Sequence, residues 1–395
     1  MVTRRKLILG TTAAAVTVPL AGGLGIAGLT TASAQETNTV PETLANRRPR
    51  LESGSRVAEG PFPLTHLALS STGAAAAVRL RTRSGWSDWR ELHTCGAARD
   101  DNQRRSVVVP ATGAVGYEIQ VAGGGPVEAL ELNTVDGPRR TVAAAESELP
   151  STGALATEAG AESGTLAAES GPRGLPKPRY LSRAAWGADE SHRFDQAGNL
   201  VWPSEFIPVQ TLTVHHTGFE DGQTDPAATV RAIYYSQAVG SGWGDIGYHL
   251  LIDDQGRVYE GRYSDPGPVP VFGPDRLPDG RPQMVNAAHV GGFNAGNLGV
   301  CLIGDFTSRQ PTRAAVRALT AVLAKLSAVC RLDPTGTTTY VNPFNAYEAT
   351  LATIPGHRDW YFANPLAGPT ECPGNDFYPR LGAIRQNVAD LLRRG

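Results

Sequence analysis

The chain has 395 residues, a formal net charge of −2 and 19% charged residues. This length allows two or three domains and at least one sizeable hydrophobic core. Without residues 1–34, which hold three basic residues and no acidic one, the charge becomes −5, so a nucleic acid partner is not expected.

Residues 1–34 have the pattern of an export signal. Arg4 and Arg5 precede an uncharged run, and Ala32-Ser33-Ala34 offers a cleavage site. The paired arginines resemble a twin-arginine signal, which exports folded proteins. The run is also long enough for an uncleaved membrane anchor, but its small residues favour cleavage. We therefore expect a secreted or cell-wall protein with no stable membrane partner.

The next residues predict a β-rich part. Residues 35–55 are polar and predict a flexible lead-in, whereas residues 56–140 contain short runs of alternating apolar and polar residues. Such runs in series predict a β-sandwich-like domain, whose role the sequence leaves open. Trp86 and Trp89 either stack on sugar rings or pack on a sheet face or at its end, and we favour packing.

Residues 141–177 consist mainly of Ala, Glu, Ser, Gly and Pro. They cannot bury enough apolar surface to offset the entropy lost on ordering, so we expect a flexible linker.

Residues 178–395 predict an α/β domain with a mixed central sheet flanked by helices. Thr211–His215 and Leu298–Ile303 are apolar enough for buried strands, and Asp225-Pro226 is a typical helix start. A second helix is expected after Thr312, where apolar residues recur every three to four positions.

Two histidines at a strand end are candidate metal ligands. His215 and His216 are adjacent, so strand alternation points them to opposite faces and only one can serve a given metal. His357 in GHRDW and Cys372 in TECPG supply another imidazole and a thiol. Two imidazoles and a thiolate suit Zn²⁺ and leave a fourth position for water, which indicates hydrolysis.

The cysteines leave one pairing open. If Cys372 binds metal, then Cys95, Cys301 and Cys330 remain, which allows at most one bridge. Cys301 and Cys330 are the better pair, but Cys301 lies in an apolar run where a free thiol packs equally well.

A series of motifs carries a family resemblance. They are, in order, HHT, WGDIGYH, VYEGR, AAH, GFNAGNLGVCLIGDF, GHRDW and TECPG. From about Leu181 to Arg394 the chain resembles the peptidoglycan recognition protein and type 2 amidase family, the zinc-dependent N-acetylmuramoyl-L-alanine amidases. The β-rich part is similar to the N-terminal region of exported actinobacterial members.

The resemblance implies roles for individual residues. It assigns Zn²⁺ to His215, His357 and Cys372, and catalytic roles to Tyr248 and Thr370. It places His289, Asn294, Asn297 and Arg262 in the substrate groove. The alternatives are that Thr370, His289 and Asn294 order loops and that Arg262 forms a structural salt bridge.

The implied reaction is hydrolysis of the amide between the lactyl group of N-acetylmuramic acid and L-alanine in peptidoglycan. The alternative is a module that binds peptidoglycan without cleaving it, but non-catalytic members lack the cysteine. A general metallopeptidase is disfavoured because no HExxH motif is present. We expect a monomer.

One segment departs from the family pattern. Residues 264–283 form a Pro/Gly-rich insertion between EGR and AAH, so the preference for the third stem-peptide residue cannot be transferred. The insertion is either a substrate lid or a passive surface loop.

Overall fold

The structure is a computed structural model that describes residues 37–71, 75–92, 105–143, 146–148, 177–219, 225–264 and 270–394. The expected export signal, Cys95 and most of the expected linker lie outside these residues. Within them, no helix combines the length and apolar composition needed to cross a membrane. Residues from Glu36 onward form one compact unit.

Residues 37–143, the front part, form strands. Their bounds are β1 Thr37–Pro41, β2 Leu44–Arg47, β3 Gly54–Glu59, β4 His66–Ser71, β5 Ala75–Thr82, β6 Gly85–Trp86, β7 Arg90–Glu91, β8 Arg105–Pro110, β9 Gly116–Gly123, β10 Glu128–Asn133 and β11 Arg139–Ala143. One sheet has the order β2-β10-β4-β8 and another the order β3-β9-β5-β6, while β1 pairs with β11. Leu67 and Leu69 of β4 and Val78 of β5 are buried in one core between the two sheets.

The expected flexible lead-in contains paired strands. In residues 35–55, β1 pairs with β11 and β2 pairs with β10. The polar residues that suggested flexibility form ion pairs instead, because Arg47 contacts Glu128 at 2.9 Å and Arg48 contacts Glu131 at 2.7 Å. The prediction of a flexible lead-in is therefore corrected.

Trp86 and Trp89 lie on the outer side of the front part, where their side chains are 38% and 40% exposed. The guanidinium carbon of Arg79 lies 4.6 Å from both ring centroids. Arg79 also contacts Glu118 on the neighbouring strand. The two rings thus stack against a cation on a sheet face rather than fill the core.

The remaining residues contain a six-stranded sheet with the order β12-β13-β17-β16-β20-β15. Its strands are β12 Glu146–Glu148, β13 Arg179–Leu181, β15 Thr211–His216, β16 Leu250–Ile252, β17 Val258–Glu260 and β20 Asn297–Leu302. β15, β20 and β16 are parallel, whereas β17 is antiparallel to β16. The predicted mixed sheet is confirmed.

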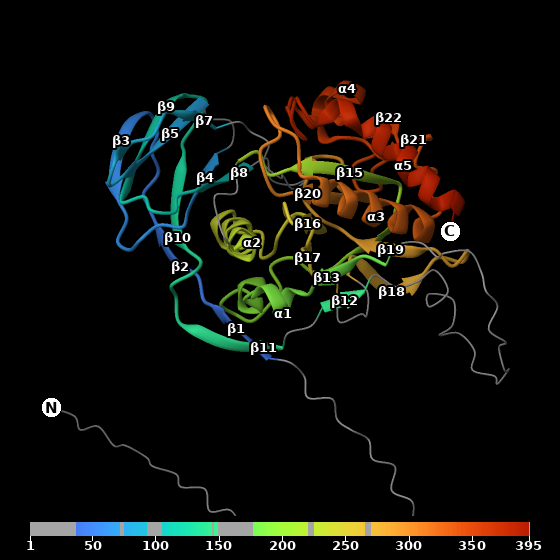
Figure 1. Cartoon of the computed structure of the whole chain (residues 1–395), viewed down its shortest axis with the longest axis horizontal. Helices are drawn as coiled ribbons and strands as arrows, with labels where there is room; N and C mark the ends of the chain where they lie inside the picture. Colours follow the sequence, from blue (N-terminus) through green and yellow to red (C-terminus); the bar gives the residue numbers. More distant parts are fainter. Residues whose placement is uncertain are drawn as a thin grey trace, which may run out of the picture. The chain divides into compact units, whose positions relative to one another are not determined.

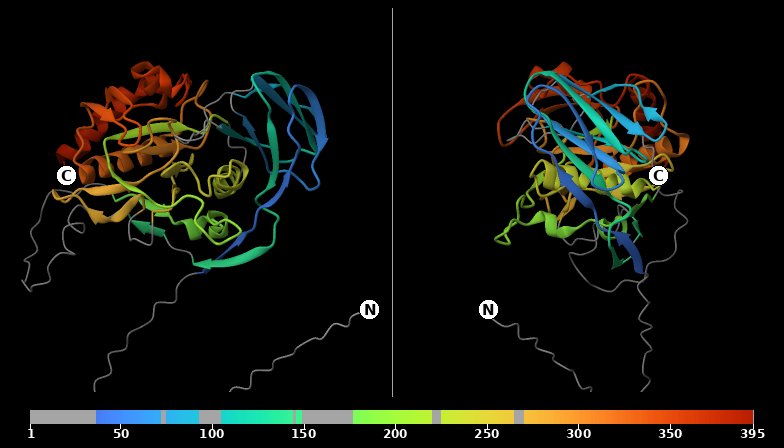
Figure 2. Two further views of the ribbon diagram at one scale, coloured as in Figure 1. Left: turned by 180° about the vertical axis from the view of Figure 1, so that it is seen from behind. Right: turned by 90° about the vertical axis from the view of Figure 1, so that its left-hand side faces the viewer.

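Helices cover both faces of this sheet (Figure 1). They are α2 Pro226–Tyr235, continued by the π-helical turn η3 Ser236–Gly240, and α3 Arg313–Cys330 and α5 Leu381–Arg394. Leu250 and Ile252 pack with α3 and α5, whereas Leu251 packs with α2, as strand alternation requires. Figure 2 shows these layers from two further directions.

Shorter elements complete the fold. They are α1 Arg183–Trp186, η2 Glu190–Arg193, β14 Phe206–Pro208, β18 Phe272–Arg276, β19 Pro282–Val285, β21 Thr337–Val341, β22 Glu348–Ala352, α4 His357–Ala363, η4 Pro365–Ala367 and η5 Tyr378–Arg380. Within the insertion at residues 264–283, β18 pairs with β19, which pairs with β14. The described part of the insertion therefore contains β18 and the start of β19, with a turn between them.

Cys301 and Cys330 are both buried and are not joined by a disulfide, which answers the open question of a bridge between them. Cys301 packs with the apolar residues around α2, whereas Cys330 packs with those around α3. The sheet separates the two thiols.

The front part shares a hydrophobic core with α2. Ala68, Val108, Leu130 and Leu132 belong to the same buried cluster as Val230, Ile233 and Tyr234. Buried polar contacts join the same surfaces, because His66 Nε2 lies 3.2 Å from Thr229 Oγ1.

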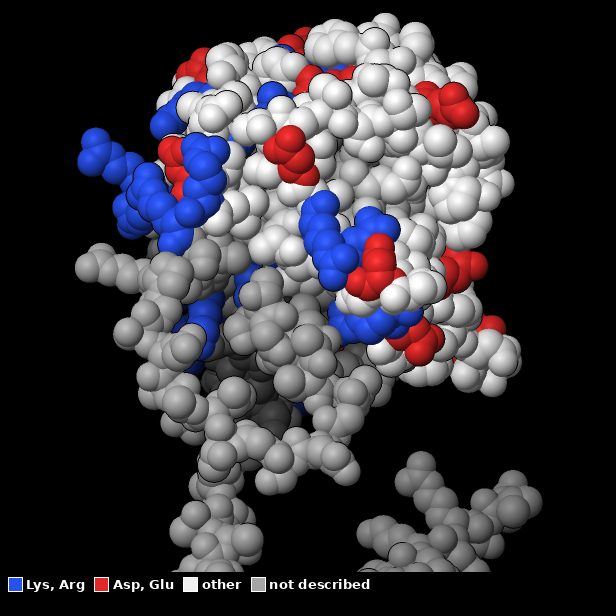
Figure 3. All heavy atoms as spheres, turned by 90° about the vertical axis from the view of Figure 1, so that its right-hand side faces the viewer, with Lys and Arg blue, Asp and Glu red and all other residues white. Residues whose placement is uncertain are grey.

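Charged side chains of both signs are interspersed on the surface that Figure 3 shows. This distribution agrees with the small net charge of the sequence.

His66 predicts a measurable pH dependence of stability. Burial, followed by the charge of Arg231, lowers the pKa of His66 to about 3, whereas an unfolded histidine titrates near pH 6.5. The unfolded state therefore binds more protons between these values, and the free energy of unfolding falls as the pH falls. We expect His66→Gln to reduce this slope by about 1.4 kcal/mol per pH unit between pH 4 and 6. Urea unfolding across that range measures it, and an unchanged slope contradicts the buried neutral state.

Candidate metal centre

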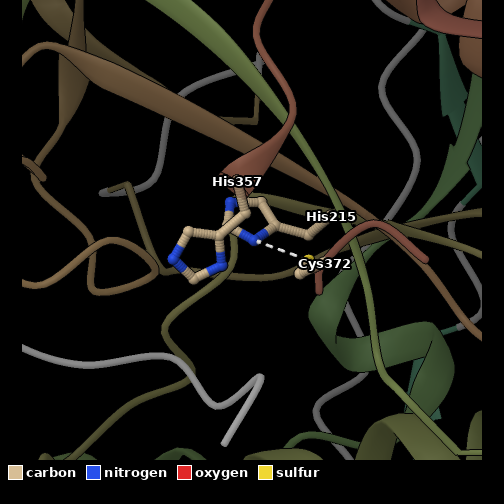
Figure 4. A group of neighbouring side chains, drawn as sticks. All are labelled: His215, His357 and Cys372. Atoms are coloured by element: carbon tan, nitrogen blue, oxygen red, sulfur yellow. Dashed lines mark hydrogen bonds between the residues drawn. The ribbon is translucent and has the colours of Figure 1, made fainter. Parts of the chain in front are cut away.

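Two imidazoles and one thiol converge at the end of β15. His215 is the last residue but one of β15 and pairs with Cys301 of β20, His357 begins α4, and Cys372 lies between η4 and η5. One ligand atom from each lies within 4.8 Å of the others, and all three residues are buried. Figure 4 shows the side chains pointing toward one another, with the contact between Cys372 Sγ and His215 Nδ1 at 3.7 Å.

Backbone pairing explains how distant residues meet. The amide of Leu212 donates to the carbonyl of Thr353, and that of Val214 donates to the carbonyl of Pro355. The segment before α4 therefore runs beside β15 and delivers His357 next to His215. The amide of Arg358 also donates to the carbonyl of Cys372 at 3.0 Å. This bond anchors the loop between η4 and η5, called the cysteine loop below, to the start of α4.

The donor set fits zinc. With tetrahedral bonds of about 2.3 Å to sulfur and about 2.0 Å to nitrogen, the two donor atoms lie about 3.5 Å apart. The observed separation between Cys372 Sγ and His215 Nδ1 is 3.7 Å. Burial first, and then the nearby His357 and His289, lower the pKa of His215 well below its usual value. His215 is therefore neutral, which is the form that ligates metals.

His289 fixes which nitrogen of His215 faces this centre. His289 Nε2 lies 2.8 Å from the carbonyl of Asn297 and must donate to it, because a carbonyl only accepts. Burial lowers the pKa of His289 to about 4, so its Nδ1 carries no proton at neutral pH. That Nδ1 lies 2.9 Å from His215 Nε2 and accepts a hydrogen bond from its N–H group. The lone pair of His215 is thereby left on Nδ1, toward Cys372.

His216 points away from the centre, as strand alternation predicts. Its Nδ1 accepts from the amide of Phe306 at 3.2 Å and lies 3.9 Å from Asp305. Its backbone does contact the centre, since the amide of His216 donates to Cys372 Sγ at 3.3 Å.

Tyr248 lies beside the centre and Thr370 orders the cysteine loop. The ring of Tyr248 is 4% exposed and its centroid lies 5.5 Å from that of His215 in an edge-on arrangement. Thr370 Oγ1 accepts from the amide of Cys372 at 3.1 Å. The structure thus supports the loop-ordering alternative for Thr370 and leaves its catalytic role as a prediction.

The four residues expected in a substrate groove are buried, with at most 1% exposure. His289 orients His215, as described above. Asn294 Oδ1 accepts from the amides of His289 and Val290, and Asn297 Oδ1 accepts from the hydroxyls of Thr211 and Thr213.

Arg262 is held in the same way. It forms an ion pair with Asp245 at 2.8 Å and donates to the carbonyls of Trp202 and Pro203. These buried contacts support the structural alternative for all four residues, and substrate contact stays a prediction.

The fold and the converging donors define a candidate metal centre in a mixed α/β domain. Residues 205–375 match the family model described as N-acetylmuramoyl-L-alanine amidase. Over these residues the chain is therefore similar to the family of N-acetylmuramoyl-L-alanine amidases.

Individual relatives agree with that family. A human N-acetylmuramoyl-L-alanine amidase is 32% identical over 28% of this chain, and human peptidoglycan recognition protein 3 is 29% identical over 36%. The matches span only 17% and 34% of those relatives. Drosophila melanogaster peptidoglycan-recognition protein SC2 is 26% identical over 51% of this chain and 83% of its own length.

Among solved structures, the chain is similar to the ectodomain complex of peptidoglycan recognition proteins LCa and LCx with bound tracheal cytotoxin. The identity is 25%, the TM-score is 0.34, and the match covers 50% of this chain and 91% of the other.

Removal of His289 tests the orientation of His215. We expect His289→Ala to weaken zinc binding by about 10- to 100-fold, because the imidazole of His215 then loses the acceptor that fixes its tautomer. Competition with a chromogenic chelator measures the affinity. His192→Ala is a matched control, since His192 lies outside the metal-ligand cluster. Equal affinities for both variants contradict the assigned role of His289.

The buried contacts of Arg262 predict a large effect on stability. We expect Arg262→Ala to lower the free energy of unfolding by about 3–5 kcal/mol, because Asp245 loses one partner of a buried ion pair. Arg281→Ala, which breaks the exposed pair with Asp279, should cost about 1 kcal/mol or less. Chemical denaturation measures both, and equal small losses contradict a structural Arg262.

Proposed function

We propose that this chain is a zinc-dependent N-acetylmuramoyl-L-alanine amidase. Its substrate is the amide between the lactyl group of N-acetylmuramic acid and L-alanine in peptidoglycan. The observation that carries the proposal is the convergence of His215, His357 and Cys372, with donor atoms within 4.8 Å of one another. The similarity of residues 205–375 to the amidase family supports the substrate class.

The residues of the chain have distinct tasks in this reaction. His215 presents an unprotonated Nδ1 because its Nε2 proton is bonded to His289. When bound by this donor set, zinc supplies Lewis acidity that activates water and polarises a carbonyl group. Tyr248 lies edge-on to His215 and carries a hydroxyl that can donate a hydrogen bond to the developing oxyanion. Thr370 holds the loop that carries Cys372.

The competing function is recognition of peptidoglycan without cleavage, which relatives named recognition proteins suggest. The position of Cys372 favours catalysis, because its sulfur completes the set of three donors. For the place of action we propose the cell wall, reached through an export signal at residues 1–34, whose pattern supports this.

Metal content and product analysis test the function. Purified protein should hold about one zinc per chain, as one site of three protein ligands requires. It should release stem peptides with a new N-terminal alanine from muropeptides, detected by mass spectrometry. Chelator treatment should stop the release and added zinc should restore it. A folded, zinc-loaded protein that leaves every muropeptide intact contradicts the enzyme.

Cys372→Ser separates cleavage from binding. We expect cleavage to fall below detection and zinc affinity to drop, because a hydroxyl is a far poorer zinc donor than a thiolate. Muropeptide binding, measured by calorimetry, should remain. Cys330→Ala is the matched control, since this buried thiol is the last residue of α3 and lies outside the metal-ligand cluster. If Cys372→Ser cleaves as fast as Cys330→Ala, the proposed catalytic centre is wrong.

A further inference from the structure

The front part meets the amidase domain along the helical segment that precedes Tyr248. Val108 of β8 and Leu130 of β10 share a buried cluster with Ile233, Ala238 and Tyr248. A Cβ placed on Gly240 of η3 would lie 3.2 Å from a methyl group of Leu130. The sheet β2-β10-β4-β8, called the front sheet below, therefore packs closely on η3 as well as on α2.

A continuous set of contacts leads from β8 to the backbone of Tyr248. The hydroxyl of Ser236 donates to that of Ser106 on β8 at 3.2 Å. The next residue, Gln237, accepts through Oε1 from the amide of Gly247 at 2.8 Å. Ser236 and Gln237 are 2% and 3% exposed, so water does not compete strongly for these bonds.

Gly247 is held from a second side. The amide of Ala288 donates to its carbonyl at 3.0 Å, and a Cβ on Gly247 would lie 2.2 Å from the carbonyl oxygen of Ala288. The backbone before Tyr248 is thus fixed between Ala288 and Gln237, with no room for a side chain.

The space between β8 and Tyr248 is almost closed. A cavity of about 20 Å³ separates them, lined by Ser106, Val107, Val108, Thr217, Phe219, Ile233, Gln237 and Tyr248. This volume is enough for about one water molecule. β8 therefore lies close beside Tyr248.

Further hydrogen bonds hold the front part against α2. Arg231 of α2 is 4% exposed and donates to the carbonyl of Thr134 through two nitrogens, at 2.9 and 3.1 Å. His66 reaches Thr229 from the front sheet. A buried apolar contact reinforced by buried hydrogen bonds is typical of a permanent interface.

We propose that the front sheet is a positioning element of the amidase site. Ser106 on β8 holds Ser236, and the adjacent Gln237 sets the backbone of Tyr248 so that its ring stands against His215. The proposal rests on the proposed amidase function for its catalytic consequence, whereas the contact chain is independent of it.

A double-mutant cycle tests the catalytic consequence. Ser106→Ala should lower kcat by about fivefold, the effect of one buried hydrogen bond, and change KM by less than about twofold. In the Tyr248→Phe background the same substitution should have no further effect, because it acts through the tyrosine. Equal losses in both backgrounds overturn the proposal.

Arg140→Ala is the matched control. Arg140 donates to the carbonyls of Gly187 and Ala188, so its loss weakens another contact of the front part without touching η3. Its effect on kcat should be the same with and without the Tyr248 hydroxyl. A loss that disappears in Tyr248→Phe would show that any weakening of the front part reaches the tyrosine, against the specific chain proposed.

Hydrogen exchange tests the contact chain without enzyme activity. In Ser106→Ala the amide of Gly247 should exchange about fivefold faster than in wild type, whereas Arg140→Ala should leave it unchanged. An unchanged rate in Ser106→Ala overturns the positioning role. If the rate rises but wild type cleaves no muropeptide, the amidase function fails and the contact chain stands.

An engineered disulfide tests whether β8 stays in contact with η3 during the reaction. Ser106→Cys with Ser236→Cys, in a Cys95→Ser background, places two thiols where the hydroxyls now lie 3.2 Å apart. The oxidised protein should retain at least about half the activity of the reduced protein. If activity is lost on oxidation and restored by reductant, β8 must move away from η3 during the reaction, and the proposal of a fixed contact is overturned.

Discussion

The pairing of residues 353–355 with β15 is the constraint on which the centre depends. Two backbone hydrogen bonds, from Leu212 to Thr353 and from Val214 to Pro355, align a late segment of the chain with an early strand. His357 follows at once, and the anchored loop brings Cys372. Neither His357 nor Cys372 lies near His215 in sequence, so the three candidate ligands come together only when the sheet has formed. This couples metal affinity to folding.

A buried polar network then gives the centre its chemistry. The hydroxyls of Thr211 and Thr213 donate to the side-chain oxygen of Asn297. The backbone carbonyl of Asn297 accepts from His289, and His289 accepts from His215. Each group in this series of hydrogen bonds has a defined donor or acceptor role. The tautomer of His215 is therefore set by His289, and that of His289 by the carbonyl of Asn297 at the start of β20. The same low dielectric that makes these bonds strong keeps the imidazoles neutral.

The sequence predicted the parts of the site that depend on chemical identity. His215, His357 and Cys372 have the residue types that zinc prefers, and strand alternation separated His216 from them. The sequence did not show which side chains face solvent. Arg262 carries a group suited to a carboxylate, yet a buried Asp245 binds it. For His289, Asn294 and Asn297 the sequence left loop ordering and substrate contact open for the same reason, because a polar side chain can bond a neighbouring backbone group as well as a ligand.

Contacts between distant segments were likewise beyond the sequence. The polar residues 46–50 suggested a flexible lead-in because their partners Glu128 and Glu131 lie on β10, far along the chain. Gln237 carries no motif signal at all, and its contact with Gly247 depends on the turn η3. The mixed sheet was predictable because it follows from local periodicity, which each strand carries in its own residues.

The core shared by the front part and α2 sets a limit on how the protein can be divided. Val230, Ile233 and Tyr234 are no more than 3% exposed and share their buried cluster with Ala68, Val108, Leu130 and Leu132. A fragment that begins at residue 178 would present this apolar face to water, and an exposed face of that kind promotes self-association. The boundary that composition marks in the chain is therefore not a boundary of the folded molecule, and a soluble fragment needs polar replacements on α2.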